Sequence, residues 1–171
     1  MMKEFERLGI SENLTVPELS HWPLEAMDQL TAIVKKHDDV LLIGSSLGGF
    51  YATCLTEQFA HARAVLVNPA VAPHRLLKSL LGETKNYYSG ESYTLTLEHL
   101  NQLKALYSDH LAFPERLLLM VQEGDESLDY RDAVTYYAKA EQIVQPEGNH
   151  GFENFDKVMP LIFRYANREY P

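Results

Sequence analysis

Residues 40–50 read Val-Leu-Leu-Ile-Gly-Ser-Ser-Leu-Gly-Gly-Phe, and this stretch decides the fold. The first four residues form a continuous apolar run, which is typical of a strand covered on both faces in a parallel sheet. Glycines at 44, 48 and 49 interrupt the run, and a helical pattern follows from Ser46 to about residue 59 or 61. The stretch therefore predicts a buried strand, a sharp turn and a helix.

Similar segments recur along the chain in alternation. Further strands are expected over residues 64–67, 117–121 and 140–144. Further helices are expected over residues 23–36, 130–139 and 153–168. Strands that alternate with helices are typical of a layered α/β fold with a mostly parallel sheet. We therefore predict a three-layer α/β fold with helices on both faces of the sheet.

The N-terminal residues add two short elements to this pattern. Residues 3–8 resemble the last turns of a helix that Gly9 ends, because glycine accepts the left-handed conformation found after a helix. Residues 13–16 form a candidate strand that Pro17 closes.

Residues 72–113 do not follow the alternation. They contain helix-like pieces at 73–81 and 97–107. Right-handed crossovers place the carboxyl ends of all parallel strands at one edge of the sheet. We expect residues 72–113 to be a small helical insertion that packs over this edge.

Size and charge exclude several classes of protein. The chain has 171 residues and a mass of 19.5 kDa, which indicates a single domain over residues 1–171. It has 15 Lys and Arg against 24 Asp and Glu, a formal charge of −9, without a basic cluster, so nucleic acid is not an expected partner.

No apolar run approaches the roughly 18 residues of a membrane span. The first ten residues lack the apolar core of a secretion signal, and we expect a cytoplasmic protein.

Metal and disulfide sites find no support in the sequence. Cys54 is the single cysteine, so it forms no internal disulfide and is expected to be a small core residue. The seven histidines show none of the spacings of a metal site. Neither a metal nor another cofactor is implied, and the oligomeric state is left open.

The glycine-rich turn carries the first chemical signal. Only Ser46 has glycines at both −2 and +2, in a G-x-S-x-G pattern between strand and helix that is typical of a serine nucleophile. We expect so sharp a turn to leave no room for side chains at the flanking positions 44 and 48, which explains why both are glycine. The backbone N–H of Leu47, at the helix N-terminus, is a candidate oxyanion donor. The alternative is a glycine-rich turn in which Ser45 or Ser46 caps the helix. A phosphate-binding loop does not fit, because the terminal Lys-Ser/Thr is absent.

A nucleophilic serine needs a histidine base and a carboxylate that orients it, in the chain order serine, acid, histidine. The loop after residues 117–121 offers Asp125, Glu126 and Asp129, and the loop after residues 140–144 offers His150. We favour Asp125, because Asp129 is placed to cap the next helix. The alternative for His150 is an exposed loop histidine.

Four segments in this order resemble the YqiA-like bacterial esterases of the α/β-hydrolase superfamily. They are residues 43–53, 67–71, 124–131 and 148–152. The resemblance implies an α/β-hydrolase-like fold and hydrolysis of small carboxylic esters or thioesters through an acyl-serine intermediate. It implies Ser46 as nucleophile, His150 as base and Asp125 as orienting acid. Tyr87, Tyr88 and Tyr93 are candidates to line an acyl pocket, with packing as the alternative.

The chain departs from this group at its N-terminus. Members of the group begin with a strand that leads into a His-Gly-Phe loop, which supplies a second oxyanion donor, and the sequence contains no such segment. We expect an N-terminally truncated form. The alternative function is therefore a catalytically impaired or inactive hydrolase-like fragment, or a binding module, that lacks half of the oxyanion hole.

Overall fold

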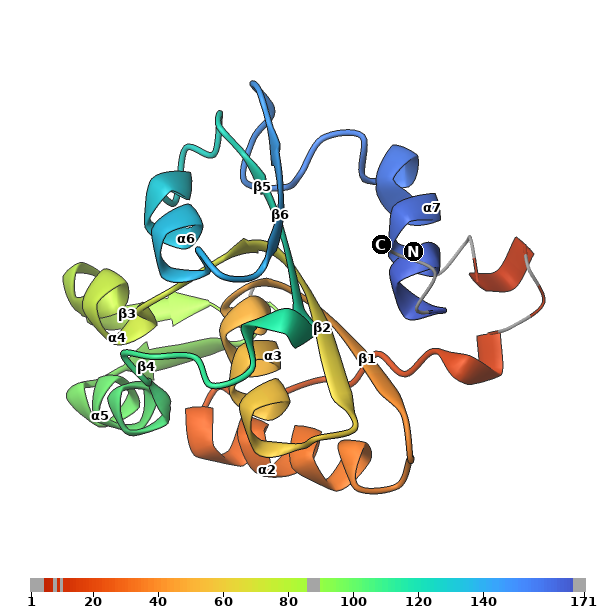
Figure 1. The fold of residues 1–171 in the computed structure, drawn as a ribbon. Helices are drawn as coiled ribbons and strands as arrows, with labels where there is room; N and C mark the ends of the chain where they lie inside the picture. The colour runs from red at the N-terminus through yellow and green to blue at the C-terminus, as the bar shows by residue number, and fades with distance from the viewer. Residues whose placement is uncertain (1–4, 8, 10, 86–89, 168–171) are drawn as a thin grey trace. The chain divides into compact units, whose positions relative to one another are not determined.

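The computed structural model describes residues 5–7, 9, 11–85 and 90–167 (Figure 1). The contacts between Cα atoms divide the chain into two compact units. One comprises residues 20–152, and the other comprises residues 1–19 together with residues 153–171.

Residues 20–152 form a four-stranded sheet with the order β1-β2-β5-β6, and all three neighbouring pairs are parallel. The strands are β1 (Val40–Ser46), β2 (Ala62–Pro69), β5 (Leu117–Gln122) and β6 (Glu141–Gln145). The helices between them are α2 (Pro23–Val34), α3 (Leu47–Gln58) and α6 (Tyr130–Tyr136). All of these elements lie within a few residues of where the sequence predicts them, so the predicted parallel α/β architecture is confirmed.

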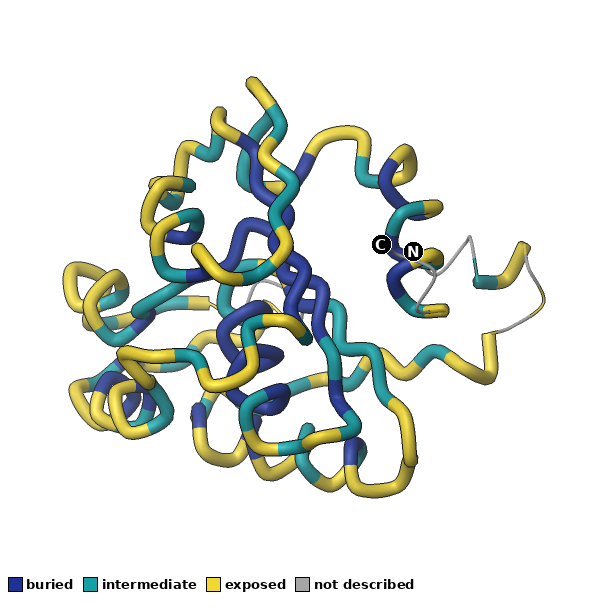
Figure 2. The backbone as a smooth tube through the Cα atoms, in the orientation of Figure 1, coloured by how far each residue is buried: buried dark blue, intermediate teal, exposed yellow. Residues whose placement is uncertain are grey.

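The core lies around the two central strands. Every residue of β5 is buried, as are all but one of β2, and both are dark blue in Figure 2. Leu66 and Leu119 point to one face, where Ala52 of α3 and Tyr137 after α6 pack against them. The continuous apolar runs arise because both faces of these strands are buried.

The first strand differs from this expectation. Residues 40–43 of β1 are only half-buried, whereas the sequence predicts complete burial. The reason is that β1 lies at one end of the strand order and pairs with β2 alone among the described residues.

The insertion contains more than helices. It comprises α4 (Pro73–Leu76), η2 (Leu77–Leu80) and α5 (Leu97–Leu106), and η3 (Pro114–Arg116) follows it directly. It also contains an antiparallel hairpin of β3 (Gly82–Lys85) and β4 (Ser92–Leu95), which the sequence analysis did not predict. Polar and apolar residues mix in these short strands, so their alternation is a weak signal.

The second unit contains η1 (Ser11–Asn13) and α7 (Phe155–Ala166). Val158, Met159 and Ile162 of α7 are buried, as its amphipathic pattern predicts. The strand expected over residues 13–16 is wrong: Leu14 instead closes a turn by donating its N–H to the Ser11 carbonyl. Phe5 to Arg7 are helical and Gly9 has a φ of 67°, so the predicted helix end is confirmed for the described part of residues 3–8.

Candidate active site

Ser46 ends β1 and directly precedes α3. Its φ of 54° and ψ of −121° form a conformation that residues other than glycine rarely adopt. Strain of this kind costs roughly 1–3 kcal/mol and persists only where the surrounding structure enforces it. The sharp strand-to-helix turn predicted from the motif is therefore present, with Ser46 at its centre.

The glycines around Ser46 are not equivalent. A Cβ atom on Gly44 would overlap the carbonyl oxygen of Gly48, so the predicted lack of room at Gly44 is confirmed. At Gly48 the prediction is wrong, because a Cβ atom there would have no neighbour within 4 Å. The crowded glycine after the serine is Gly49, where a Cβ atom would lie 2.6 Å from Cβ of Pro69. The crowded position is Gly49 rather than Gly48 because α3 packs closely on β2 at Pro69.

Leu47 is the first residue of α3. The N–H groups in the first turn of a helix have no partner within the helix and carry partial positive charge. The Leu47 N–H therefore belongs to a set of donors beside the Ser46 side chain.

Asp125 and His150 lie in hydrogen-bond contact. Nδ1 of His150 is 2.8 Å from Oδ2 and 3.0 Å from Oδ1 of Asp125. Oδ1 also accepts the N–H groups of Ser127 and Leu128, each at 2.9 Å. The Asp125 side chain is only 2% exposed, while that of His150 is 26% exposed. A carboxylate accepts from Nδ1–H, which leaves Nε2 as the ring nitrogen that can accept a proton.

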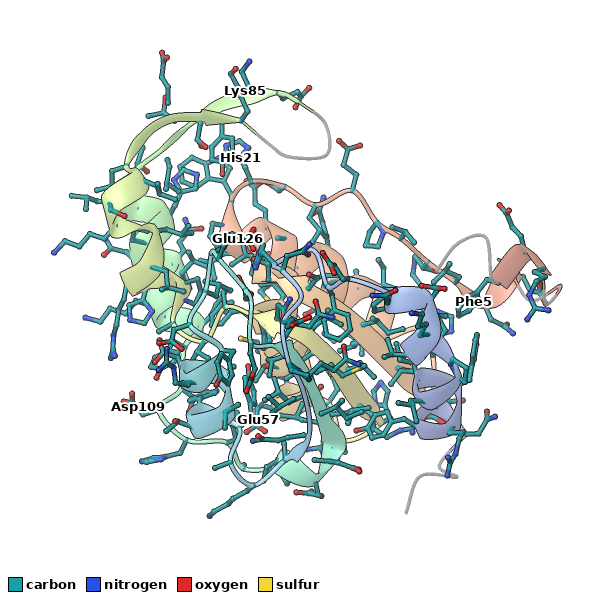
Figure 3. The ribbon with its side chains drawn as sticks, turned by 90° about the horizontal axis from the view of Figure 1, so that it is seen from above. Phe5, His21, Glu57, Lys85, Asp109 and Glu126 are labelled. Carbon is teal, nitrogen blue, oxygen red and sulfur yellow. The ribbon has the colours of Figure 1, made fainter. Side chains whose placement is uncertain are left out.

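The other two candidate acids make different contacts. Glu126 (labelled in Figure 3) accepts the backbone N–H of His150 at 3.0 Å through Oε2, and this hydrogen bond lowers the pKa of Glu126. Asp129 is the N-cap of α6 and accepts the N–H and Nε–H groups of Arg131. Asp125 is therefore the acid in contact with the His150 ring, and Asp129 has the capping position that the sequence suggests.

Ser46, Asp125 and His150 follow the carboxyl ends of β1, β5 and β6. Parallel strands of one sheet end at the same edge. Although both residues are described, the Ser46 hydroxyl and the His150 ring share no hydrogen bond. The structure thus pairs Asp125 with His150 and places Ser46 at the same edge without a direct bond to the pair.

Two buried amides beside this site escaped the sequence analysis. Asn68 follows the apolar residues of β2 and is 2% exposed, and Gln122 ends β5 and is 3% exposed. Asn68 also has a positive φ of 41°. Two features of the sequence could have indicated these amides. Each is a polar residue at the end of a buried apolar run, and Asn68 also belongs to an Asn-Pro pair at a strand end.

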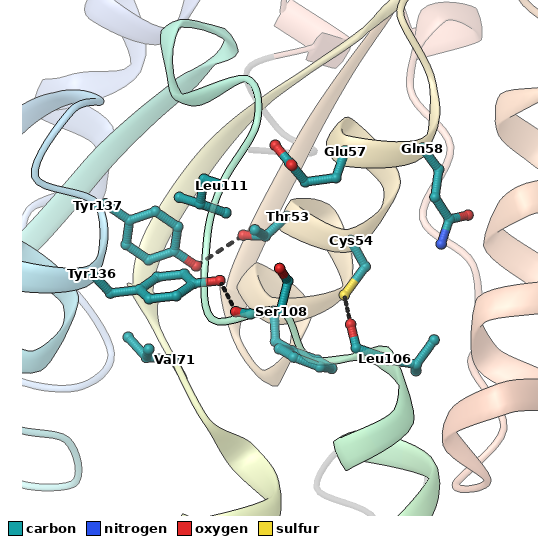
Figure 4. A pocket seen from close by; sticks show the side chains of 11 residues that line it. Thr53, Cys54, Glu57, Gln58, Val71, Leu106, Ser108, Leu111, Tyr136 and Tyr137 are labelled. Carbon is teal, nitrogen blue, oxygen red and sulfur yellow. Dashed lines mark hydrogen bonds between the residues drawn. The ribbon is translucent and has the colours of Figure 1, made fainter.

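A small pocket of about 140 Å3 lies against α3 (Figure 4). Thr53 and Tyr137 share a hydrogen bond of 2.9 Å across it, and the Cys54 thiol donates to the Leu106 carbonyl at 3.5 Å. Cys54 is buried and unpaired by disulfide, as predicted, and burial raises the pKa of its thiol to about 12. Such a thiol is unreactive.

A larger cleft of about 750 Å3 is lined by the insertion and by residues on and before α6. Pro69 lines it and pairs with Ser46 in the register of β1 and β2. Leu128 also lines it and donates its N–H to Asp125. Two of the residues that line the cleft are therefore direct neighbours of Ser46 or Asp125.

The tyrosines proposed for an acyl pocket divide into two groups. Tyr93 lines neither cavity and packs on His21 and His99, with ring centroids 4.7 and 5.9 Å away. Tyr87 and Tyr88 lie outside the described residues.

No three His, Cys, Asp or Glu side chains within the described ranges converge as metal ligands would. In the same ranges, every helix is too short or too polar to cross a membrane.

Comparison with solved structures defines the class of fold. The esterase domain of a Rhodothermus marinus protein is 21% identical, with a TM-score of 0.59 over 85% of this chain and 67% of that chain. Est1E from Butyrivibrio proteoclasticus, with ferulic acid bound, is 15% identical, with a TM-score of 0.62 over 88% of this chain and 69% of that chain. Mouse alpha/beta hydrolase domain-containing protein 10 is 13% identical, with a TM-score of 0.63 over 85% of this chain and 68% of that chain. The chain has the α/β-hydrolase fold.

The chain belongs to the family described as "Uncharacterised protein family (UPF0227)", whose family model matches residues 1–167. This family is the YqiA-like group that the four motifs resemble, so the resemblance is confirmed.

Proposed function

We propose that the protein is a serine esterase that hydrolyses small carboxylic esters through an acyl-Ser46 intermediate. The observation that carries this proposal is the backbone of Ser46, held at a φ of 54° at the sheet edge where His150 contacts Asp125. A strained strand-to-helix turn at the serine and a carboxylate–histidine pair are two features of a serine hydrolase site of this fold.

Acylation begins at the Ser46 hydroxyl. Nε2 of His150 takes the hydroxyl proton while Oγ forms a bond to the ester carbonyl carbon. Asp125 keeps the proton on Nδ1 and stabilises the imidazolium that forms. The tetrahedral intermediate then expels the alcohol, which leaves with the proton from Nε2.

Deacylation repeats these steps with water. His150 removes a proton from water, the hydroxide adds to the acyl carbon, and Ser46 regains its proton as the carboxylic acid leaves. The Leu47 N–H stabilises the oxyanion in both halves of the reaction. A thioester follows the same steps with a thiol as the leaving group, and the cleft beside Pro69 and Leu128 is the space we assign to the acyl group.

Hydrolysis of p-nitrophenyl acetate tests this proposal, with S-phenyl thioacetate as the thioester probe. Ser46→Ala is expected to abolish turnover, and Asp125→Asn is expected to lower kcat by about 100-fold or more, because the histidine loses its orienting carboxylate. A wild-type rate in Ser46→Ala would contradict the proposal. The absence of any wild-type rate would favour an inactive binding module.

Asp129→Asn is the matched control for Asp125→Asn. It makes the same chemical change four residues away, in a carboxylate that caps α6 and contacts Arg131 rather than His150. We expect a kcat within about threefold of wild type, with any change confined to KM, because Asp129 lines the cleft assigned to the acyl group but does not touch His150. Equal loss of kcat in the two variants would argue against Asp125 as the orienting acid.

A further inference from the structure

Side chains from three other segments bind the backbone polar groups of Asn149 and His150. The His150 ring projects from this short stretch between β6 and α7, which has no regular secondary structure. Its neighbours Glu147, Gly148 and Phe152 have φ values of 60°, 79° and 61°. These angles are unfavourable for Glu147 and Phe152, so the segment needs outside contacts to keep one conformation.

Asn68 binds both carbonyl groups. Its Nδ2 donates to the carbonyl of Asn149 at 3.0 Å and to that of His150 at 3.1 Å. Its Oδ1 accepts the N–H of Gln122 at 3.0 Å, which fixes the orientation of the amide. The Asn68 side chain is buried and the two bonds are partly buried, so their loss would remove donors from carbonyl groups with limited access to water.

Gln122 binds the first of the two N–H groups. Its Oε1 accepts from the N–H of Asn149 at 3.1 Å, and its Nε2 donates to Oε1 of Gln145 at 2.9 Å. A Cβ atom on Gly148 would overlap the Gln122 amide. The glycine therefore allows the loop to approach Gln122.

Glu126 binds the second N–H group, that of His150 itself, at 3.0 Å. All four backbone polar groups of Asn149 and His150 thus have side-chain partners on Asn68, Gln122 or Glu126. We name these three residues the His150 clamp.

We infer that Asn68, Gln122 and Glu126 are positioning residues that fix the backbone of His150, so that its ring keeps contact with Asp125 at the sheet edge where Ser46 lies. The inference rests on the proposed function in that it takes His150 as the base. A displacement of about 1 Å in a catalytic group can lower the rate by about 100-fold, so removal of the clamp has a kinetic consequence beyond stability.

Gln122→Met and Asn68→Asp test the inference. Gln122→Met keeps the length of the side chain and removes its amide. Asn68→Asp keeps the acceptor for Gln122 and tolerates the positive φ, but loses the donor to the two carbonyls. We expect kcat for p-nitrophenyl acetate to fall by about 100-fold in each variant, with KM changed less than threefold.

Gln142→Met is the matched control. The Gln142 amide on β6 also donates to two backbone carbonyls, those of Val134 at 3.0 Å and Tyr137 at 2.8 Å, and it makes no hydrogen bond to Asn149 or His150. We expect this variant to lower Tm as the clamp variants do, with an unchanged kcat. Clamp variants that match Gln142→Met in both kcat and Tm would overturn the inference.

A second readout does not depend on activity. The proton on Nδ1 of His150 is held by the Asp125 carboxylate and should give a low-field 1H NMR signal, assigned by its loss in His150→Gln. We expect the signal to broaden or move in the clamp variants and to stay unchanged in Gln142→Met. An unchanged signal in all variants would overturn the inference. A wild-type protein without esterase activity would contradict the proposed function, and the NMR signal would still decide the role of the clamp.

Discussion

Ser46 holds a backbone conformation that suits glycine, yet the proposed chemistry requires a hydroxyl at this position. An L side chain at such angles costs roughly 1–3 kcal/mol, whereas glycine adopts them at little cost. Function and stability therefore favour different residues at position 46.

This conflict predicts that Ser46→Gly is more stable than Ser46→Ala. Both variants lack the hydroxyl, and only glycine relieves the strain, so we expect a difference of about 1 kcal/mol in the free energy of unfolding. For a chain of this size that corresponds to about 2–4 °C in Tm. Calorimetry of the two variants measures it, and an equal or higher Tm for Ser46→Ala would show that position 46 is unstrained.

The two glycines of the G-x-S-x-G motif are predicted to respond oppositely to alanine. A Cβ atom on Gly44 meets backbone, which cannot move aside, so we expect Gly44→Ala to cost about 3 kcal/mol. Gly48 lies in the first turn of α3 with open space around it, and Gly48→Ala should be neutral or stabilising by up to about 1 kcal/mol. Urea unfolding of both variants checks the signs, and a large loss of stability in Gly48→Ala would contradict the open space seen at that residue.

At the scale of single residues, the sequence predicts the sharp turn at Ser46 and the neighbouring positions of Asp125 and His150, because each stands in a short local pattern: a glycine-flanked turn or a loop directly after an apolar strand. It does not predict the roles of Asn68 and Gln122. Their hydrogen bonds join segments distant in sequence, and an isolated amide in a sequence does not indicate which backbone group it will bind.

Among the elements, α5 and the start of α2 meet through stacked aromatic rings. The rings of His99 and Trp22 lie 3.8 Å apart at 13°, and His99 is 1% exposed. Nδ1 of His99 completes the capping box of α5 with Thr96, while Nε2 is buried without a hydrogen-bond partner among the described residues. Burial lowers the pKa of His99, the adjacent His21 lowers it further, and Glu98 acts in the opposite direction.

The sign of the resulting pH dependence follows from this shift. Because the folded-state pKa of His99 is depressed, the unfolded state binds the proton more readily, and stability is lost as pH falls below about 6.5. We expect His99→Gln, which can keep the capping box without titrating, to lose less Tm than wild type between about pH 7.5 and pH 5. The exposed His110→Gln is the control and should follow wild type. Superimposable curves for wild type and His99→Gln would contradict this assignment.

The long elements are predictable because their apolar runs or helical periodicity reflect burial. The β3–β4 hairpin is not, because its strands of four residues contain few buried positions. The strand expected over residues 13–16 fails for a related reason: a short apolar alternation specifies a strand only where a neighbouring strand pairs with it.

At the scale of the whole molecule, the parallel sheet brings together loops that are distant in sequence. The ends of β1, β5 and β6 carry Ser46, Asp125 and His150, and β2 between them carries Asn68. The sheet order therefore accounts for both the candidate catalytic residues and the clamp. Strand alternation predicts this shared edge, whereas the contacts among the side chains follow only from the three-dimensional structure.

The central claim is that Ser46 is an activated nucleophile. A fluorophosphonate reacts with a serine hydroxyl only where a base activates it, and intact mass with peptide mapping locates the label. We predict one label per chain, on Ser46, that is lost in Ser46→Ala and strongly slowed in Asp125→Asn but not in Asp129→Asn. An unlabelled chain, or a label on another serine, would contradict the claim.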